Sequence, residues 1–196
     1  MKRLCSYSVY LCILGSTLML SSCGSGKKTT ASTNAASANQ DSKRAKEKKL
    51  KETYATLLSV SPHDVDNLLL YSFIDDWYGV PYKFAGKSKQ GIDCSDFVSV
   101  LFDKVYGTNL MGNCSDLISQ CRPIKEEDLK EGDLVFFKIN SKSISHVGVY
   151  LQNHHFVHAS VHSGIVISDL NMDYYKKYFY KAGRLKISLS QNSYKD

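Results

Sequence analysis

Cys94 lies between two acidic residues in the stretch GIDCSDF (residues 91–97), directly before apolar residues at helical spacing. That spacing places Cys94 at the start of a helix, with Asp93 as the N-cap residue. Backbone amides and the dipole at a helix start favour a thiolate and lower the pKa of a cysteine there. Asp93 and Asp96 oppose this effect. Cys94 is therefore a candidate nucleophile that would need a cationic partner, and histidine is the usual one.

Two of the six histidines lie in short β-rich runs where they could supply that partner. Side chains alternate between the two faces of a strand, so His146 in SHVGVYL and His158 in HHFVHAS each have a defined face. Two neighbouring antiparallel strands could present both histidines to one face. If that face meets the start of the Cys94 helix, the three side chains form one site.

Such a site predicts a nucleophilic mechanism. Cys94 would attack a carbonyl carbon as a thiolate, and His146 would take and return the proton. His158 would orient His146 through its other ring nitrogen. The backbone amide of Cys94, at the helix start, would be an oxyanion donor.

Two other interpretations of these residues remain open at this point. A lone cysteine such as Cys94 is more often a small buried core residue than a nucleophile. His146, His154, His155 and His158, together with a cysteine, could also supply four zinc ligands. Neighbouring histidines on a strand point to opposite faces, which makes this group a poor shared site. We therefore predict no metal site and no cofactor.

The elements that would position these residues change character along the chain. A helix is expected from about Cys94 to Tyr106, closed by Gly107, and a second short helix around residues 115–121. Beyond Gly132 the chain has short β-rich runs separated by Asn, Gly and Ser. Helices followed by strands predict an α+β domain, with the long helix packed against an antiparallel sheet. The expected strands are DLVFFKI, SHVGVYL, HHFVHAS, GIVISDL and KAGRLKI, with a helical turn at YYKKYFY before the last.

The segments before this domain differ in composition. Residues 23–41 are rich in Ser, Ala, Thr and Asn, which predicts a flexible tether. Residues 42–61 favour a basic helical stalk with little apolar face. A further helix is expected from the N-cap Ser61 to Gly79, within a domain that spans residues 62–187. Residues 188–196 form a C-terminal tail.

The N-terminus is typical of an exported protein. Two basic residues precede a short apolar stretch interrupted by Ser and Gly, which predicts a signal peptide over residues 1–22. The end of this stretch, LSSC, resembles a bacterial lipobox, which implies cleavage before Cys23 and lipidation of its sulfur. Loss of Lys2 and Arg3 lowers the formal charge from +6 to +4. The basic run at residues 42–51 is not a nucleic-acid motif by itself, so no nucleic-acid partner is expected.

Export also leaves an odd number of cysteines. Cys94, Cys114 and Cys121 remain once the signal peptide and the lipidated residue are set aside. If Cys114 and Cys121 shared one helix, they would be about 10 Å apart, beyond the reach of a disulfide. They could pair only if that stretch were not one helix, and we expect two unpaired core residues.

Four motifs resemble the NlpC family of bacterial cell-wall cysteine endopeptidases. They are D-C-S-x-F at 93–97, E-G-D-L-V-F-F at 131–137, S-H-V-G-V-Y at 145–150 and F-V-H-A-S at 156–160. The similarity covers roughly residues 68–187. It implies a papain-like core and resembles most the small lipid-anchored murein endopeptidases of Gram-negative outer membranes.

The resemblance also implies roles for single residues. Cys94 matches the nucleophile, His146 the base and His158 the third polar residue. Tyr82, in Y-K-F-A-G, matches a tyrosine whose hydroxyl lines the site, and Ser95 matches a serine that borders the substrate groove.

Two single residues and one short stretch depart from the family pattern. Ala85 and Asp96 stand where relatives often have glycine, and L-M-G-N at 110–113 replaces a usual L-P-R. That last loop borders the groove, so its change leaves the cleaved bond open. We expect Asp96 to raise the pKa of Cys94 or to shape the groove.

Together these observations predict an exported thiol endopeptidase. It would be lipid-anchored to a bacterial membrane, the outer membrane facing the periplasm, and would cut stem-peptide or cross-link amide bonds of peptidoglycan. The alternatives are a non-catalytic peptidoglycan-binding lipoprotein and a Cys-His amidase or transferase on another substrate. A regulatory protein partner is expected, but no residue identifies it.

Overall fold

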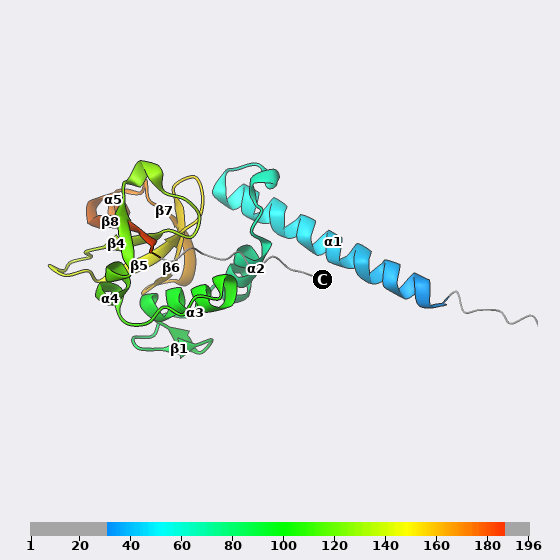
Figure 1. Ribbon diagram of the computed structural model, residues 1–196, viewed down its shortest axis with the longest axis horizontal. Helices are drawn as coiled ribbons and strands as arrows, with labels where there is room; N and C mark the ends of the chain where they lie inside the picture. Colours follow the sequence, from blue (N-terminus) through cyan, green and yellow to red (C-terminus); the bar gives the residue numbers. More distant parts are fainter. Residues whose placement is uncertain (1–30, 187–196) are drawn as a thin grey trace, which may run out of the picture. The chain divides into compact units, whose positions relative to one another are not determined.

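The computed structural model describes residues 31–186 (Figure 1). The chain divides into two compact units, residues 1–39 and 40–196. In the first unit the described residues, 31–39, are helical. The described part of the second unit contains the predicted domain.

Several predictions fall outside the described residues. These are the signal peptide (1–22), the lipidation of Cys23, the first part of the tether and the tail (188–196). No helix among the described residues is long and apolar enough to cross a membrane.

The tether prediction was wrong for its second half. Helix α1 runs over Ala31–Leu58, so residues 31–41 are helical. The segment from Ala31 has four alanines in its first eight residues and no Gly or Pro. Helix propensity therefore outweighs the effect of its Ser, Thr and Asn content.

The end of α1 belongs to the domain, so the boundary predicted at residue 62 is too late. Tyr54, Ala55 and Leu58 are buried in the main core. The ring centroids of Tyr54 and Tyr71 lie 4.9 Å apart. Apolar residues at positions i, i+1 and i+4 place one face of the last helical turns against the body of the domain.

The helix expected from Ser61 to Gly79 is interrupted. A short 3-10 helix, η1 (Pro62–Asp64), follows the predicted N-cap Ser61, and α2 covers Leu68–Trp77. Val65 is fully buried between them. The side chain of Asn67 accepts a hydrogen bond from the Leu70 amide and caps α2. A second cap and a buried valine thus replace a continuous helix.

The helix predicted from Cys94 to Tyr106 is confirmed. Helix α3 covers Cys94–Tyr106 and ends at Gly107, whose φ of 61° is the left-handed conformation that favours glycine. Ahead of it lies a small hairpin of β1 (Lys87–Ser88) and β2 (Gly91–Ile92). The second short helix, α4, covers Cys114–Ser119.

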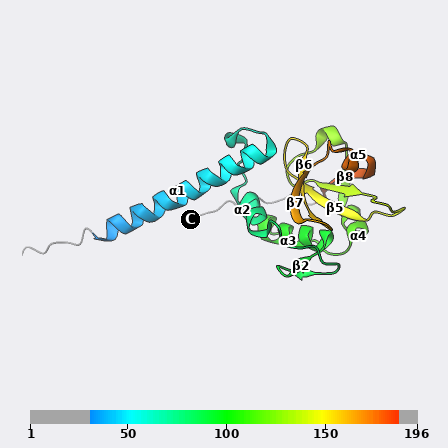
Figure 2. The same ribbon diagram turned by 180° about the vertical axis from the view of Figure 1, so that it is seen from behind.

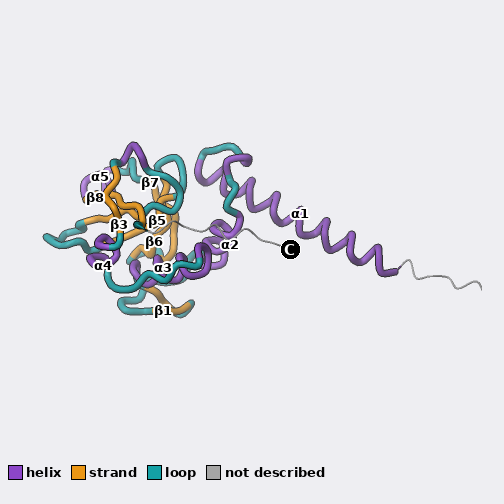
Figure 3. The backbone as a smooth tube through the Cα atoms, in the orientation of Figure 1, coloured by secondary structure: helices purple, strands orange, loops and turns teal. Residues whose placement is uncertain are grey.

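The predicted antiparallel sheet is also confirmed, and among the described residues it has six strands in the order β3-β8-β4-β5-β6-β7. Strand β3 was not among the five expected strands. A 3-10 turn, η2 (Glu126–Asp128), precedes β4, and helix α5 (Asp173–Tyr178) leads into β8 as expected. Figures 2 and 3 show the strands from two sides. The strands are β3 (Cys121–Ile124), β4 (Leu134–Phe137), β5 (His146–Tyr150), β6 (His155–Ser160), β7 (Gly164–Asp169) and β8 (Phe179–Leu185).

The sheet has a different apolar cluster on each face. The main core combines α2 and α3 with Val147, Val149 and Val157. A second cluster contains Phe137, Phe156 and, from α5, Tyr175. Helices α3 and α5 lie on opposite sides of the strands (Figures 1 and 2). The α+β class is confirmed, because helices α2 and α3 precede an antiparallel sheet and pack against one of its faces. Strands β4, β5 and β6 divide their side chains between the two clusters.

Candidate active site

Cys94 is the first residue of α3, and the Asp93 side chain caps this helix. One carboxylate oxygen of Asp93 accepts from the Asp96 amide at 2.8 Å and from the Ser95 hydroxyl at 2.9 Å. The other accepts from the Ala85 amide at 3.1 Å. The N–H of Cys94 has no acceptor within the helix, because the first four amides of a helix have none. This amide is available to a substrate oxygen.

The sulfur of Cys94 is surrounded by groups that favour a thiolate. A hydrogen bond from the Cys114 thiol lowers its pKa most, and the Sγ–Sγ distance is 3.7 Å. Hydrogen bonding and charge from His146, together with the Val147 amide, lower it further, whereas burial raises it. The net pKa of Cys94 is about 5.

The two predicted histidines are in contact. Nε2 of His146 lies 2.7 Å from Nδ1 of His158, and both residues are buried. Strands β5 and β6 pair Val149 with Val157, and this register continued places His158 opposite Gly148. A Cβ on Gly148 would lie 3.2 Å from the His158 Cβ. The missing side chain gives His158 the room to lean towards His146.

Two further polar groups hold His158. Its Nε2 lies 3.0 Å from the Ser168 hydroxyl on β7 and 3.2 Å from the Tyr175 hydroxyl on α5. The Ser168 hydroxyl also donates to Tyr175 at 3.3 Å. Burial, followed by the charge of His146, lowers the pKa of His158 well below its usual value. His158 is therefore neutral.

One arrangement of protons satisfies these contacts and leaves His146 able to act as a base. If Nε2 of His158 donates to Ser168, its Nδ1 is an acceptor, and Nε2 of His146 donates to it. The remaining nitrogen of His146, Nδ1, is then the one available to Cys94. In this arrangement His146 is the tautomer that can take a proton from the thiol.

One geometric expectation differs from the structure. The histidines share a face, but that face packs on the second cluster, where Phe137 and Phe156 contact their rings. Helix α3 packs on the other face. Cys94 meets His146 at the start of β5, where the Val147 amide also reaches it. The site forms around the end of a strand and not across a flat face.

Tyr82 lies close to the nucleophile, as the resemblance implied. It is half-buried, forms a bridge with Ile92, and has a pKa raised by burial and then by the charges of Cys94 and Asp93. The hydroxyl of Ser95 donates to Asp93. Its role beside a substrate stays a prediction.

The unusual residues Asp96 and Ala85 have local explanations. Asp96 forms an ion pair with Lys87 at 3.4 Å, which ties the β1–β2 hairpin to α3. Its proposed effect on Cys94 stays a prediction. Ala85 has a φ of 54°, the left-handed conformation, which accounts for the glycine that relatives often have there.

The three described cysteines are free thiols. Cys114 begins α4 and Cys121 begins β3, so they do not share one helix. The prediction that Cys114 and Cys121 are unpaired and buried is confirmed. The Cys121 thiol donates to the Leu117 carbonyl at 3.4 Å.

The described residues do not show the arrangement of ligands that a zinc site would need. Their His, Cys, Asp and Glu side chains do not form a group of three that could hold a metal ion. His154 lies in the turn before β6, and His155 bonds to the Asn153 carbonyl.

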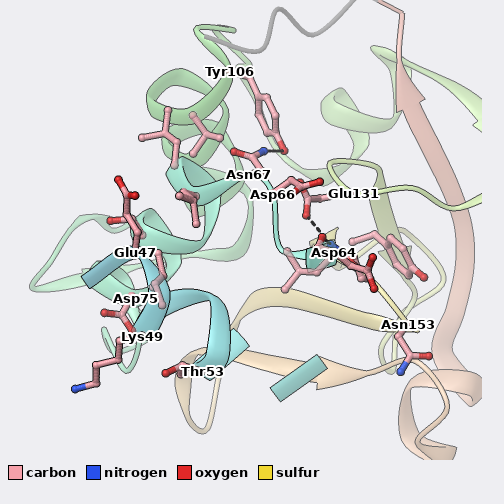
Figure 4. A pocket seen from close by; sticks show the side chains of 18 of the residues that line it. Glu47, Lys49, Thr53, Asp64, Asp66, Asn67, Asp75, Tyr106, Glu131 and Asn153 are labelled. Carbon is pink, nitrogen blue, oxygen red and sulfur yellow. Dashed lines mark hydrogen bonds between the residues drawn. The ribbon is translucent and has the colours of Figure 1, made fainter. Parts of the chain in front are cut away.

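A hollow of about 1440 Å³ lies elsewhere, between α1, α2 and the loop after β5 (Figure 4). Its lining includes Glu47, Asp66, Asn67, Tyr106 and Glu131, and Asn67 contacts the Tyr106 hydroxyl at 3.4 Å. None of the three predicted catalytic side chains lines it. The concentration of proton-transfer groups marks the active site better than the size of a hollow does.

Sequence reasoning missed three residues of the site: Cys114, Ser168 and Tyr175. Cys114 was treated only as a disulfide or core candidate. Ser168 on β7 pairs with Phe156, two residues before His158, so its position depends on the strand register. Tyr175 comes from a helix on the far side of the sheet. None of these contacts leaves a local sequence pattern.

The comparisons with known proteins agree with this geometry. The model of the NlpC/P60 family matches residues 79–184. The chain is 40% identical over 110 residues to the Escherichia coli K12 protein named murein DD-endopeptidase MepS/murein LD-carboxypeptidase. That match covers 56% of this chain and 58% of the relative. The chain is also 36% identical over 113 residues to the probable endopeptidase NlpC of the same organism. This second match covers 57% of this chain and 73% of the relative.

A solved structure shares the fold. A crystal structure of a lipoprotein-like NLP/P60 family protein from Staphylococcus aureus superimposes with a TM-score of 0.56 and 27% identity. The match covers 61% of this chain and 41% of that one. The papain-like fold expected from the motifs is confirmed. The chain spans less than two thirds of the length of the MepS relative.

Proposed function

This chain belongs to the NlpC/P60 family, and from that membership and the surroundings of Cys94 we propose that it is a cysteine peptidase acting on peptidoglycan peptides. The relative named murein DD-endopeptidase MepS/murein LD-carboxypeptidase supports the substrate class. The contact between His146 on β5 and His158 on β6, with Cys94 at the start of α3 beside His146, carries the proposal.

In the first step, the Cys94 thiolate attacks the carbonyl carbon of a peptide bond. The Cys94 amide at the start of α3 donates to the oxygen that becomes negative. His146 holds the proton from the thiol and passes it to the leaving amine, which leaves an acyl group on Cys94. His158 keeps the His146 ring in place during this transfer.

In the second step, water replaces the amine. His146, now neutral, takes a proton from the water that attacks the acyl group, and the carboxylic acid product leaves Cys94 as a thiolate. His158 stays neutral in both steps because its ring is buried. All proton movement is therefore assigned to His146.

Two segments beside Cys94 are suited to contact the substrate. Phe84, which follows Tyr82 closely, and Met111, which precedes Cys114, are exposed apolar side chains in loops. Met111 lies in the L-M-G-N loop that departs from the family pattern. We assign the choice between stem-peptide and cross-link bonds to these loops.

The test is digestion of purified sacculi, with released muropeptides measured by mass spectrometry. The full chain should release fragments, and Cys94→Ser should not. Cys121→Ser is the matched control, because it removes a buried thiol outside the site. Equal release by the wild type and Cys94→Ser would contradict the cysteine mechanism, and no release by either would leave a binding role only. Product masses also separate hydrolysis from transfer and identify the bond.

We further propose that the protein is exported and lipid-anchored through Cys23. The signal sequence and the LSSC stretch support this, and murein as the substrate requires export. Labelling with a fatty acid followed by membrane fractionation tests the anchor. Label on the wild type that is absent from Cys23→Ala is the expected result, and equal labelling of both would contradict it.

A further inference from the structure

Cys114 is a buried thiol in contact with the nucleophile, and the proposed reaction does not consume it. Its Sγ lies 3.7 Å from Sγ of Cys94, and the two residues are 7% and 6% exposed. Cys94 begins α3 and Cys114 begins α4, so each sulfur is attached to a helix start of defined position. The two cysteines are twenty positions apart in the sequence.

We propose that Cys94 and Cys114 form a reversible disulfide on exposure to a hydroperoxide, and that this bond inactivates the site until a dithiol reduces it. The inactivation rests on the proposed function, whereas the disulfide does not. The proposal stands on the contact between two free thiols at the reacting atom.

The geometry requires only a small movement. A disulfide has an S–S distance of about 2.05 Å, so the two sulfurs must approach by about 1.7 Å. Rotation of two cysteine side chains on neighbouring helix starts can supply a movement of this size. Cys121, at the start of β3, is placed differently, because its thiol donates a hydrogen bond to the Leu117 carbonyl.

The chemistry balances with a hydroperoxide as the oxidant. The Cys94 thiolate attacks one peroxide oxygen, so that an S–O bond forms, the O–O bond breaks and hydroxide leaves. Cys114 then attacks the sulfur of the Cys94 sulfenic acid, which forms the S–S bond and breaks the S–O bond. The Cys114 proton leaves with the second hydroxide as water. Two thiols lose two electrons, and one hydrogen peroxide becomes two waters.

The charges around the pair favour this order of events. Cys94 is a thiolate above about pH 5 and is therefore the thiol that reacts with the peroxide. Hydrogen bonding to Cys94 and burial raise the pKa of Cys114, so it stays protonated while Cys94 is charged. Once Cys94 becomes a neutral sulfenic acid, the main cause of that raised pKa is gone.

The direct test maps the thiols of the reduced full chain after hydrogen peroxide treatment. Trypsin places Cys94 in residues 90–104, and Cys114 with Cys121 in residues 105–125, because proline follows Arg122. We expect a linked pair of these two peptides under non-reducing conditions. Cys121→Ser is the matched variant that assigns the link to Cys114, and it should form the same pair.

Two results of the thiol mapping would overturn the proposed disulfide. Cys94 found as sulfinic acid with Cys114 still a free thiol in the wild type would overturn the proposal. So would a link that persists in Cys114→Ser and involves Cys121. Mapping of the wild type needs no variant, and Cys114→Ala is a second variant if Cys114→Ser does not fold.

Activity gives the second readout. Wild type and Cys121→Ser should lose digestion of sacculi on oxidation and regain it with dithiothreitol. Cys114→Ser should lose activity to peroxide without recovery, since Cys94 proceeds to the sulfinic acid. A disulfide that forms in a protein inactive before oxidation would refute the proposed function but not the disulfide. Full activity in the disulfide form would overturn the proposal that this bond inactivates the site.

Discussion

Nε2 of His146 lies 2.7 Å from Nδ1 of His158, although the two residues are not directly opposed in the sheet. The contact is diagonal and depends on Gly148, which leaves the space opposite His158 unfilled. Diagonal neighbours on antiparallel strands are within reach of aromatic side chains. The pair connects the base of the site to groups on β7 and α5.

The first prediction concerns those groups. Ser168 and Tyr175 both contact Nε2 of His158, so each can hold the ring when the other is removed. Ser168→Ala and Tyr175→Phe alone should each lower kcat/KM several-fold. The double variant should approach His158→Ala, with a loss of about 100-fold or more.

Kinetics on a soluble stem peptide measure this, and Tyr174→Phe is the matched control. Tyr174 is the neighbouring, half-exposed tyrosine of α5. A double variant with wild-type kinetics would remove Ser168 and Tyr175 from the mechanism. A change in kcat with an unchanged free energy of unfolding would separate positioning from a loss of stability.

The second prediction concerns pH. The pKa of Cys94 is about 5, below that of a free thiol, so the reactive thiolate is lost as pH falls through 5. The thiolate stabilises the folded state fully above the pKa of the unfolded thiol, and this contribution disappears as pH falls to about 5. The rate of Cys94 alkylation by iodoacetamide should follow the same curve.

Cys114→Ala should move the alkylation midpoint to higher pH, because the largest cause of the lowered pKa is removed. Cys114→Ser keeps a donor and should move it less. A midpoint near 5 in Cys114→Ala would show that His146 alone sets the pKa of Cys94.

The extent to which the site could be predicted follows from the range of each interaction. The α3 helix, its cap Asp93 and its end at Gly107 were predicted because each signal lies within the segment itself. The histidines were placed on a common face by strand alternation. The meeting of Cys94 with Cys114 and of His158 with Tyr175 depends on packing between distant segments, which no local pattern records.

The errors have physical causes of the same kind. The sequence between Ser61 and Gly79 has a start signal and an end signal, but burial of Val65 and the Asn67 cap divide it. The first turns of α1 have a polar composition that is typical of a tether, but the helix propensity of their residues outweighs it. Burial and capping decided the structure in the first case, and intrinsic helix propensity decided it in the second.

The third prediction concerns Gly148. A methyl group there would meet the Phe156 ring at 2.6 Å and the Val157 carbonyl oxygen at 2.9 Å. Gly148→Ala should lower the free energy of unfolding by about 1–3 kcal/mol. It should also reduce kcat, because His158 must move away from His146.

Gly183→Ala is the matched control for overpacking. Its added methyl would meet the Cys121 Cβ at 2.7 Å on β8, away from the histidines. Denaturant unfolding and kinetics on both variants separate the effects. Comparable losses of kcat in both would mean that the sheet as a whole, and not the histidine pair, limits activity.

The fourth prediction concerns the motif E-G-D, whose last residue is structural. Asp133 is buried, and its two carboxylate oxygens accept from Nε and Nη2 of Arg184 at 2.7 Å each. The pair joins the turn before β4 to β8. Asp133→Ala removes two of the hydrogen bonds of the guanidinium and leaves its bond to the Asp128 carbonyl. It should lower the free energy of unfolding by about 2–4 kcal/mol.

The matched control is the exposed pair of Lys125 and Glu127, at 3.1 Å. Glu127→Ala should change the free energy of unfolding by less than about 0.5 kcal/mol, because solvent screens that pair. Urea unfolding of both variants measures the difference. Kinetics at a temperature where Asp133→Ala is folded should show a kcat close to wild type, since Asp133 acts on the fold. A large loss of kcat in the folded variant would instead connect this motif to the site.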